Sequence, residues 1–288
     1  MQNSIVIREE ENWEEMLGYA KQAGFTEVSF SFGTPEFFLQ ADYKSKIDRM
    51  KEVLDQKGLV CKQTHLPFYH LTVSSEIAEE TMELGILRCI EESARLGAEW
   101  TAYHPRTAVN AGYNQTKSFE DNRRYLAKYL ETAEKYGVGI AIENMPLYPY
   151  EKPYWRFFGG GWEEIAELCD SFQSDKVGIC WDFGHAHTAA IEQAHAIRDL
   201  GKRIKITHVH DNYRNGDHHQ LPLMANPIWG CVDWKSAMRA LREVQYEGAL
   251  TLELIYPPLP MCDTFMKLAY ECLENLKKCG EEKDDIRK

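Results

Sequence analysis

Six side chains that can bind metal ions or transfer protons stand at the ends of short apolar segments of this 288-residue chain. They are His65, His104, Glu143, Asp182, His208 and Glu253. The first four lie at positions 65, 104, 143 and 182, 39 residues apart, which indicates one repeating structural unit. Glu143, Asp182, His208 and Glu253 together form an oxygen and nitrogen donor set. Such a set suits Mn²⁺, Zn²⁺, Mg²⁺ or Co²⁺ rather than a soft thiolate site.

The segments that carry these residues read as β-strands, with amphipathic helical patterns between them. Strands are predicted at 5–7, 27–32, 60–65, 100–104, 139–143, 177–182, 204–208 and 249–253. Helical patterns include 12–23, 75–96, 118–136 and 234–244. A glycine separates several helical stretches from the next strand, as in YGVGIAIE, which is typical of a helix C-cap.

Eight strands that alternate with helices predict an α/β fold, a single (β/α)8 TIM barrel with a parallel eight-stranded core. A doubly wound open sheet is the alternative with the same alternation. No linker or shift in composition divides the chain, so we expect residues 1–288 to form one barrel domain. Because the carboxyl ends of barrel strands meet at one mouth, the six side chains should converge there.

Composition excludes several classes of protein. The formal net charge of −12 repels a phosphate backbone, so nucleic acid is not expected as the main partner. The eight cysteines contain no CxxC pair and are expected to be reduced thiols. The polar start MQNSIVIREE and the absence of a long apolar run predict a cytoplasmic protein without a signal peptide or membrane span.

Seven short motifs occur in an order that resembles the xylose isomerase-like TIM barrel superfamily. They are THLPF (64–68), YHPR (103–106), IEN (142–144), WDFGHAH (181–187), HVHDN (208–212), DHH (217–219) and LELIYP (252–257). That superfamily includes sugar and sugar-phosphate isomerases and epimerases and the AP endonuclease family 2 enzymes of the endonuclease IV type. The resemblance implies the TIM barrel fold, a divalent metal cofactor and a small-molecule sugar or polyol substrate.

By this resemblance, Glu143, Asp182, His208 and Glu253 match the metal ligands of the ketose 3-epimerase branch, with Mn²⁺ or Zn²⁺ as the main candidate ions. Glu143 and Glu253 also match its two catalytic acid/base carboxylates, and His185 and Arg214 match substrate-binding residues. The implied enzyme is a metal-dependent sugar, sugar phosphate or polyol isomerase or epimerase. It would transfer a proton through an enediolate.

The endonuclease IV branch offers an alternative, because all nine of its metal-ligand types have a counterpart here. The residues beyond the central four are His65, His104, His185, Asp217 and His219, which provide for a second and a third ion. The sequence after the DHH motif, QLPLMANPIWGCVDW, departs from the family pattern. The loop that carries Asp217 and His219 could therefore be displaced from its position in the family. A non-catalytic metal-binding barrel is a second alternative, although Glu143 and Glu253 are both intact.

Aromatic residues supply candidates for a sugar-stacking wall. Phe68 and Trp229 are predicted to contact the substrate, together with the aromatic segment LYPYEKPYWRFFGGGW (147–162). That segment could equally pack on the barrel rim or in the interface of a homo-oligomer. Among the remaining histidines, His210 and His218 are expected to support the metal ligands at most, His187 to begin a helix, and His70 and His195 to be surface or helix residues.

Overall fold

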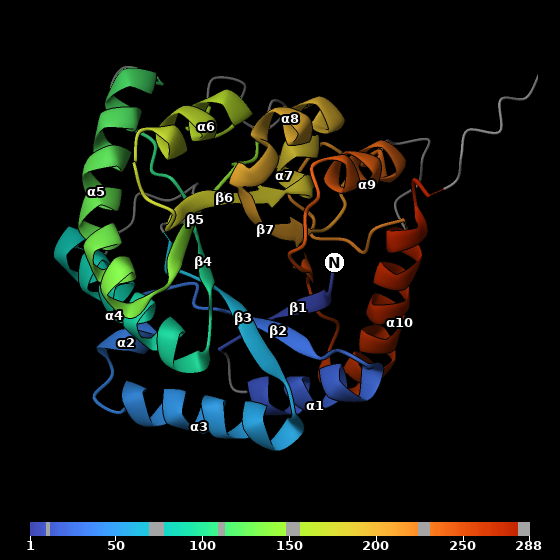
Figure 1. Cartoon of the computed structure of the whole chain (residues 1–288). Coiled ribbons are helices and arrows are strands. Elements are labelled where there is room, and N and C mark those ends of the chain that lie inside the picture. The colour runs from blue at the N-terminus through green and yellow to red at the C-terminus, as the bar shows by residue number, and fades with distance from the viewer. Residues whose placement is uncertain (10–11, 69–77, 109–112, 148–155, 224–230, 282–288) are drawn as a thin grey trace, which may run out of the picture.

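A computed structural model describes residues 1–9, 12–68, 78–108, 113–147, 156–223 and 231–281. Eight parallel strands close into a barrel in chain order, from β1 to β8, and helices surround them (Figure 1). The prediction of a TIM barrel is therefore confirmed, and the open-sheet alternative is wrong.

The strands lie close to their predicted positions. They are β1 (Asn3–Arg8), β2 (Glu27–Ser31), β3 (Val60–His65), β4 (Trp100–Tyr103), β5 (Gly139–Glu143), β6 (Val177–Asp182), β7 (Ile204–Val209) and β8 (Leu250–Leu252). His104 and Glu253 lie one residue beyond β4 and β8, a difference that is common at strand ends. The six strand-end side chains thus share one end of the barrel.

Helices connect the strands on the outside of the barrel. They are α1 (Trp13–Ala23), α2 (Glu36–Leu39), α3 (Tyr43–Lys57), α4 (Glu79–Leu96), α5 (Gln115–Tyr136), α6 (Trp162–Asp170), α7 (Phe183–Thr188), α8 (Gln193–Leu200), the short 3₁₀ helix η1 (Gly201–Arg203), α9 (Trp234–Glu243) and α10 (Leu259–Lys278). Helix α5 begins three residues before its predicted start because Asn114 caps it, its side chain accepting a hydrogen bond from the Lys117 backbone N–H. Within the described residues, no helix is both long and apolar enough to cross a bilayer.

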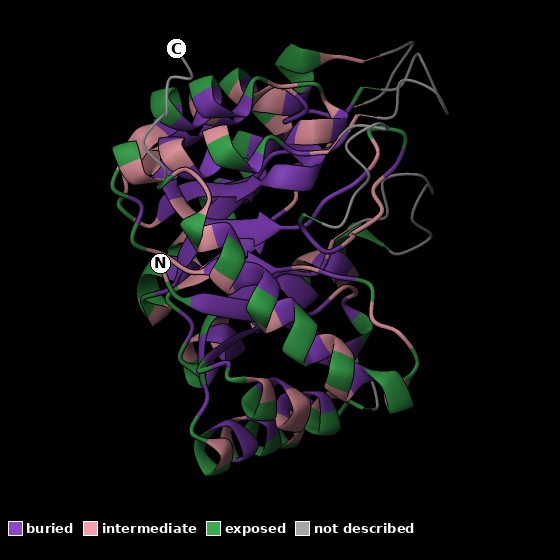
Figure 2. Ribbon diagram, turned by 90° about the vertical axis from the view of Figure 1, so that its right-hand side faces the viewer, coloured by how far each residue is buried: buried purple, intermediate pink, exposed green. Residues whose placement is uncertain are grey.

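The strands are almost entirely buried, whereas the helices expose their outer faces (Figure 2). Inside the barrel, at the end opposite the mouth, the indole of Trp100 occupies the space beside Gly139 and Gly178 on the next two strands. A Cβ atom added to Gly139 would lie far inside van der Waals contact with that indole, and one added to Gly178 would lie inside contact with Lys205. Both glycines are needed because larger side chains already fill this part of the barrel.

This packing predicts the effect of adding a methyl group. Gly139→Ala should lower the free energy of unfolding by about 1–3 kcal/mol, because the indole of Trp100 must move out of a close-packed site. Gly18→Ala is the matched control. The atom nearest to its new Cβ would be the flexible Lys57 Nζ at 3.5 Å, and alanine favours the interior of α1 by up to about 1 kcal/mol. Urea unfolding of both variants measures the difference, and equal stability would contradict this view of the packing.

Candidate metal centre

Four groups of potential metal-binding side chains lie at the mouth of the barrel; three of them share Glu143, and one of those three contains Cys180. In each group the potential ligand atoms lie within 4.8 Å of one another. The central group is Glu143, Asp182, His208 and Glu253, the second is His65, His104 and Glu143, and the third is His185, His210, Asp217 and His219. All nine sequence-predicted ligands therefore fall into these groups.

In the central group, one imidazole nitrogen faces three carboxylates from neighbouring strands. His208 Nδ1 lies 3.1 Å from Glu143 Oε1, 3.3 Å from Glu253 Oε2 and 3.9 Å from Asp182 Oδ2. Cys180 Sγ also lies near Glu143 and His208, but burial raises the pKa of this thiol, which keeps it a poor ligand. The side chain of Glu253 retains 14% of its exposure, whereas the other members of the group are fully buried. Solvent or a ligand can thus approach from the side of Glu253.

The second group uses the other oxygen of Glu143. His65 Nε2 and His104 Nε2 each lie 3.3 Å from Glu143 Oε2 and 3.1 Å from each other. Because each carboxylate oxygen of Glu143 belongs to a different group, this residue can bridge two adjacent ions.

The third group lies in and around the loop after β7. Asp217 Oδ2 is 3.2 Å from His185 Nε2 and 3.0 Å from His219 Nε2. The loop is closed by paired backbone hydrogen bonds between Asp211 and Gln220, at 2.8 and 3.0 Å. The unusual sequence that follows the DHH motif therefore does not move Asp217 and His219 away from the site.

His210 is a full member of the third group, whereas the sequence predicts a supporting role for it at most. It is fully buried, and its Nε2 lies 3.1 Å from the Asp182 carboxylate and 3.6 Å from Asp217 Oδ1. A Cβ on Gly184 would overlap its ring, so glycine at that position makes room for it. The signal for this residue in the sequence is its spacing from His208, two residues along β7 and its continuation.

Backbone carbonyls orient three of the histidines. Nδ1–H of His65 donates to Leu66 O at 2.7 Å, that of His185 to Asn144 O at 2.9 Å, and that of His219 to Glu253 O at 2.8 Å. Each of these bonds turns Nε2 toward the carboxylates, and once the ring is neutral it leaves the lone pair on Nε2. This is the usual arrangement around metal-binding imidazoles.

His208 is held by side chains instead. Its Nε2 lies 2.8 Å from Gln63 Nε2, and Gln63 Oε1 accepts a hydrogen bond from Thr251 Oγ1 at 3.0 Å. A half-turn of the Gln63 amide would let Oε1 accept from His208 Nε2–H and leave the Nδ1 lone pair free for a metal. The sequence does not single out Gln63, because nothing in the pattern of β3 shows that it faces His208.

Electrostatics show how strongly the carboxylates and imidazoles interact. Burial alone would raise the pKa of Glu143, but its interactions with the imidazoles of His208 and His104 outweigh burial and hold this pKa well below its usual value. The pKa of Asp217 is lowered in the same way beside His185 and His219. Burial opposes the charged form of His219, yet Asp217 raises its pKa to about 9. At neutral pH a metal ion must therefore displace a proton from His219.

Two buried oxygen atoms show that the residues fit a cation. Glu143 Oε2 and Asp217 Oδ1 have no hydrogen-bond partner among the described residues. An unsatisfied buried carboxylate oxygen is costly, and a divalent ion in the second group and another in the third would compensate these two atoms. The mixed imidazole and carboxylate ligands suit Zn²⁺ or Mn²⁺.

The residues predicted to contact the substrate differ in where the structure places them. Phe68 packs on the site, with ring centroids 4.5 Å from His104 and 5.1 Å from His65. Arg214 is exposed, and its charge acts together with burial to lower the pKa of His187 in α7 to about 4. Trp229 lies outside the described residues, as do His70, Tyr148, Tyr150, Tyr154 and Trp155. Of the aromatic segment, Phe157 and Phe158 are buried in the turn that precedes α6.

The fold agrees with that of a known family. Residues 17–279 match the model of the xylose isomerase-like TIM barrel family, and the chain belongs to that family. The resemblance suggested by the ordered motifs is thereby confirmed.

Individual relatives are distant. The chain is 28% identical over 195 residues to the uncharacterised protein MJ1311 of Methanocaldococcus jannaschii, in a match that covers 66% of this chain and 62% of that protein. It is 25% identical over 219 residues to a D-psicose 3-epimerase of Enterocloster bolteae, covering 73% and 66% of the two chains. The crystal structure of a D-tagatose 3-epimerase-like protein superposes with a TM-score of 0.73 at 21% identity, covering 96% and 99%. Such similarity to a solved structure shows the shared fold.

The contact between Gln63 and His208 gives a prediction for metal binding. Gln63→Leu removes the hydrogen-bond partner of His208 Nε2 and should weaken metal affinity about 10–100-fold. Gln63→Glu keeps an acceptor at this position and should retain or increase the affinity. Competition with a metal-binding dye measures both constants, and equal affinity in the wild type and Gln63→Leu would contradict the role of this side chain.

Proposed function

We propose that the protein is a divalent-metal-dependent sugar isomerase or epimerase. The observation that carries this proposal is the central group, in which the two carboxylates of Glu143 and Glu253 both contact His208 Nδ1 at a barrel mouth. The similarity to a D-psicose 3-epimerase and to a D-tagatose 3-epimerase-like structure supports a sugar as substrate.

Glu143, Asp182, His208 and Glu253 would hold the metal. When bound, the ion would hold two adjacent oxygens of the sugar and polarise the carbonyl group. Glu143 is fully buried and Glu253 is partly exposed, and in the proposed mechanism their carboxylates would act on a substrate carbon from different sides. One carboxylate would remove the proton from that carbon, and the other would return a proton on the opposite face. Phe68 would cover the apolar side of the sugar and exclude water.

A specific observation also favours a second candidate. The central and second groups share Glu143, and Asp182 lies between the central group and His210, as a multinuclear centre requires. A phosphodiesterase of the endonuclease IV type would use such a centre to activate water. The net charge of −12 counts against a nucleic-acid substrate, since phosphate contacts supply most of the affinity for DNA.

The two glutamates provide the test of proton transfer. Glu143→Gln and Glu253→Gln should each lower the rate of ketose epimerisation by about 10²-fold or more, because an amide cannot act as the base. The single variants should differ in deuterium wash-in from D₂O, since one of them can still exchange a substrate hydrogen without completing the reaction. Product analysis by NMR on a panel of ketoses measures both quantities.

Glu27→Gln is the matched control, because Glu27 is a buried carboxylate at the start of β2, at the end of the barrel opposite the mouth. Its activity should equal that of the wild type. Near-wild-type turnover in both mouth variants would overturn the proton-transfer mechanism. Incision of an abasic-site duplex at enzymatic rates, without turnover of any ketose, would establish the phosphodiesterase instead.

A further inference from the structure

One cationic side chain stands in the ring of strand-end residues and takes no part in the metal groups. Arg8 is the last residue of β1, and the strand register aligns it with Ser31 of β2, which in turn aligns with His65 of β3. Aligned residues of neighbouring parallel strands point to the same face of a sheet. Arg8 therefore occupies, on β1, the inward-facing position that His65 occupies on β3.

Arg8 has few partners for its charge. Its Nη1 donates to the Leu254 carbonyl at 3.1 Å, and its guanidinium carbon lies 6.0 Å from the centroid of the Tyr256 ring. No carboxylate in the described part of the chain forms an ion pair with it. Arg106 and Arg156, which also follow mouth-side strand ends, are paired with Glu79 at 3.7 Å and Glu164 at 2.9 Å. A guanidinium carries five N–H donors, so most of those of Arg8 remain available to a ligand.

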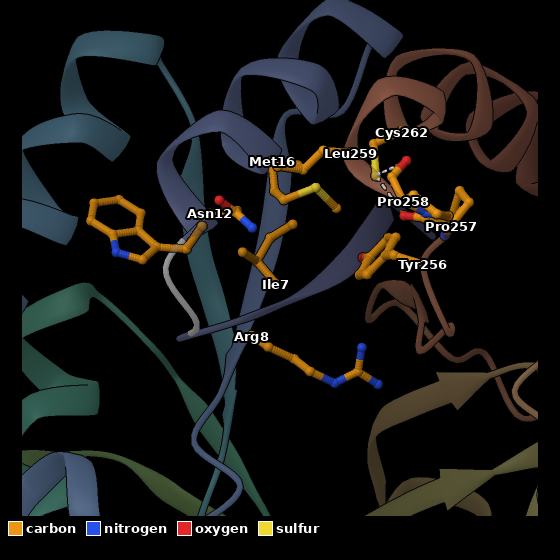
Figure 3. Close-up of a pocket in the computed structure, with 10 residues that line it drawn as sticks. Ile7, Arg8, Asn12, Met16, Tyr256, Pro257, Pro258, Leu259 and Cys262 are labelled. Atoms are coloured by element: carbon orange, nitrogen blue, oxygen red, sulfur yellow. Dashed lines mark hydrogen bonds between the residues drawn. The ribbon is translucent and has the colours of Figure 1, made fainter.

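The surroundings of Arg8 form a cavity of about 240 Å³ at the junction of β1, β8 and the starts of α1 and α10. Its walls are largely apolar and include Trp13, Met16, Tyr256 and Leu259. Figure 3 shows Ile7, Met16 and Leu259 together on one side, with the Arg8 guanidinium apart from them. The Tyr256 hydroxyl donates to the Val6 carbonyl, which fixes the ring beside Arg8.

None of the metal-binding residues lines this cavity, but Arg8 itself is bonded to the chain segment that carries one of them. Leu254, whose carbonyl accepts from Arg8, directly follows Glu253, and Glu253 Oε2 lies 3.3 Å from His208 Nδ1. A sugar held at the metal by its reacting end would therefore extend toward Arg8 with its remote end.

We propose that Arg8 binds an anionic group, a carboxylate or a phosphate, at the end of the substrate remote from the reacting carbons. The inference rests on the proposed function, because it takes the reacting end of a sugar to lie at the metal. A protein with a net charge of −12 repels anionic ligands at long range, so an unpaired arginine beside the site is the local feature that such a substrate needs. The guanidinium fork matches the paired oxygens of both groups.

Three ketoses with the same reacting end test the proposal: D-fructose, D-fructuronate and D-fructose 6-phosphate. Calorimetric titration of the Mn²⁺-loaded protein should show at least one acidic ketose binding about 10-fold or more tightly than D-fructose, as expected for charge-assisted hydrogen bonds. The acidic ketose that is preferred identifies the group as carboxylate or phosphate. Arg8→Met should lose this preference while keeping the affinity for D-fructose and the metal content, and Arg8→Lys should keep part of it.

Arg88→Met is the matched control. Arg88 also donates to one backbone carbonyl, that of Phe38, and lies over a tyrosine ring, that of Tyr43 at 5.2 Å, but it belongs to the outer helix α4. Its preference for the acidic ketose should equal that of the wild type. Equal affinity of the wild type for all three ketoses would overturn the inference, as would an equal loss of affinity for all three in Arg8→Met.

Failure of the proposed function would instead appear as a lack of epimerisation of every ketose, whatever their relative affinities.

Discussion

The site is organised around the burial of one carboxylate, that of Glu143. An ionised carboxylate without exposure is tolerated only when cations or hydrogen-bond donors surround it. Glu143 meets this condition at only one oxygen, which faces His208 Nδ1; its other oxygen, 3.3 Å from His65 Nε2 and from His104 Nε2, has no hydrogen-bond partner among the described residues. Two of those imidazoles are in turn held by groups with no charge of their own, the Leu66 carbonyl and the Gln63 amide. The negative charge thus remains available to a metal ion instead of being consumed by a lysine or arginine.

The barrel makes this arrangement possible because the carboxyl ends of β3 to β8 all open on the same mouth. The 39-residue spacing from His65 to Asp182 reflects one strand and one helix per unit, and for that reason the fold and the meeting of the strand-end side chains at one mouth are predictable from the sequence alone. Strand positions are predictable for the same reason, since β-branched and aromatic runs are bounded by helix caps such as Gly137. Helix starts are less predictable, because α5 begins where Asn114 finds a backbone N–H to cap.

The remaining parts of the site depend on contacts between residues far apart in the chain, which one sequence does not reveal. His210 joins the third group because Gly184 leaves space for its ring, and Gln63 is important only through its contact with His208, 145 residues away. Arg8 does not stand out in the sequence, because a single arginine at the end of a short apolar strand is common on protein surfaces. Its significance comes from the strand register and from the lack of a described carboxylate beside it.

The aromatic segment after β5 shows the opposite case, in which a clear sequence pattern is only partly informative. Its composition predicts a sugar wall or packing on the barrel rim, and of its rings Phe157 and Phe158 are buried in the turn before α6.

Binding of a divalent ion by Glu143, Asp182, His208 and Glu253 can be observed by anomalous diffraction from crystals of the full chain grown with MnCl₂, recorded on both sides of the manganese absorption edge. We expect a strong peak at about 2.0–2.3 Å from one atom of each of these four side chains. Absence of a peak there, with His208 in direct contact with the carboxylates at full Mn²⁺ saturation, would contradict the assignment.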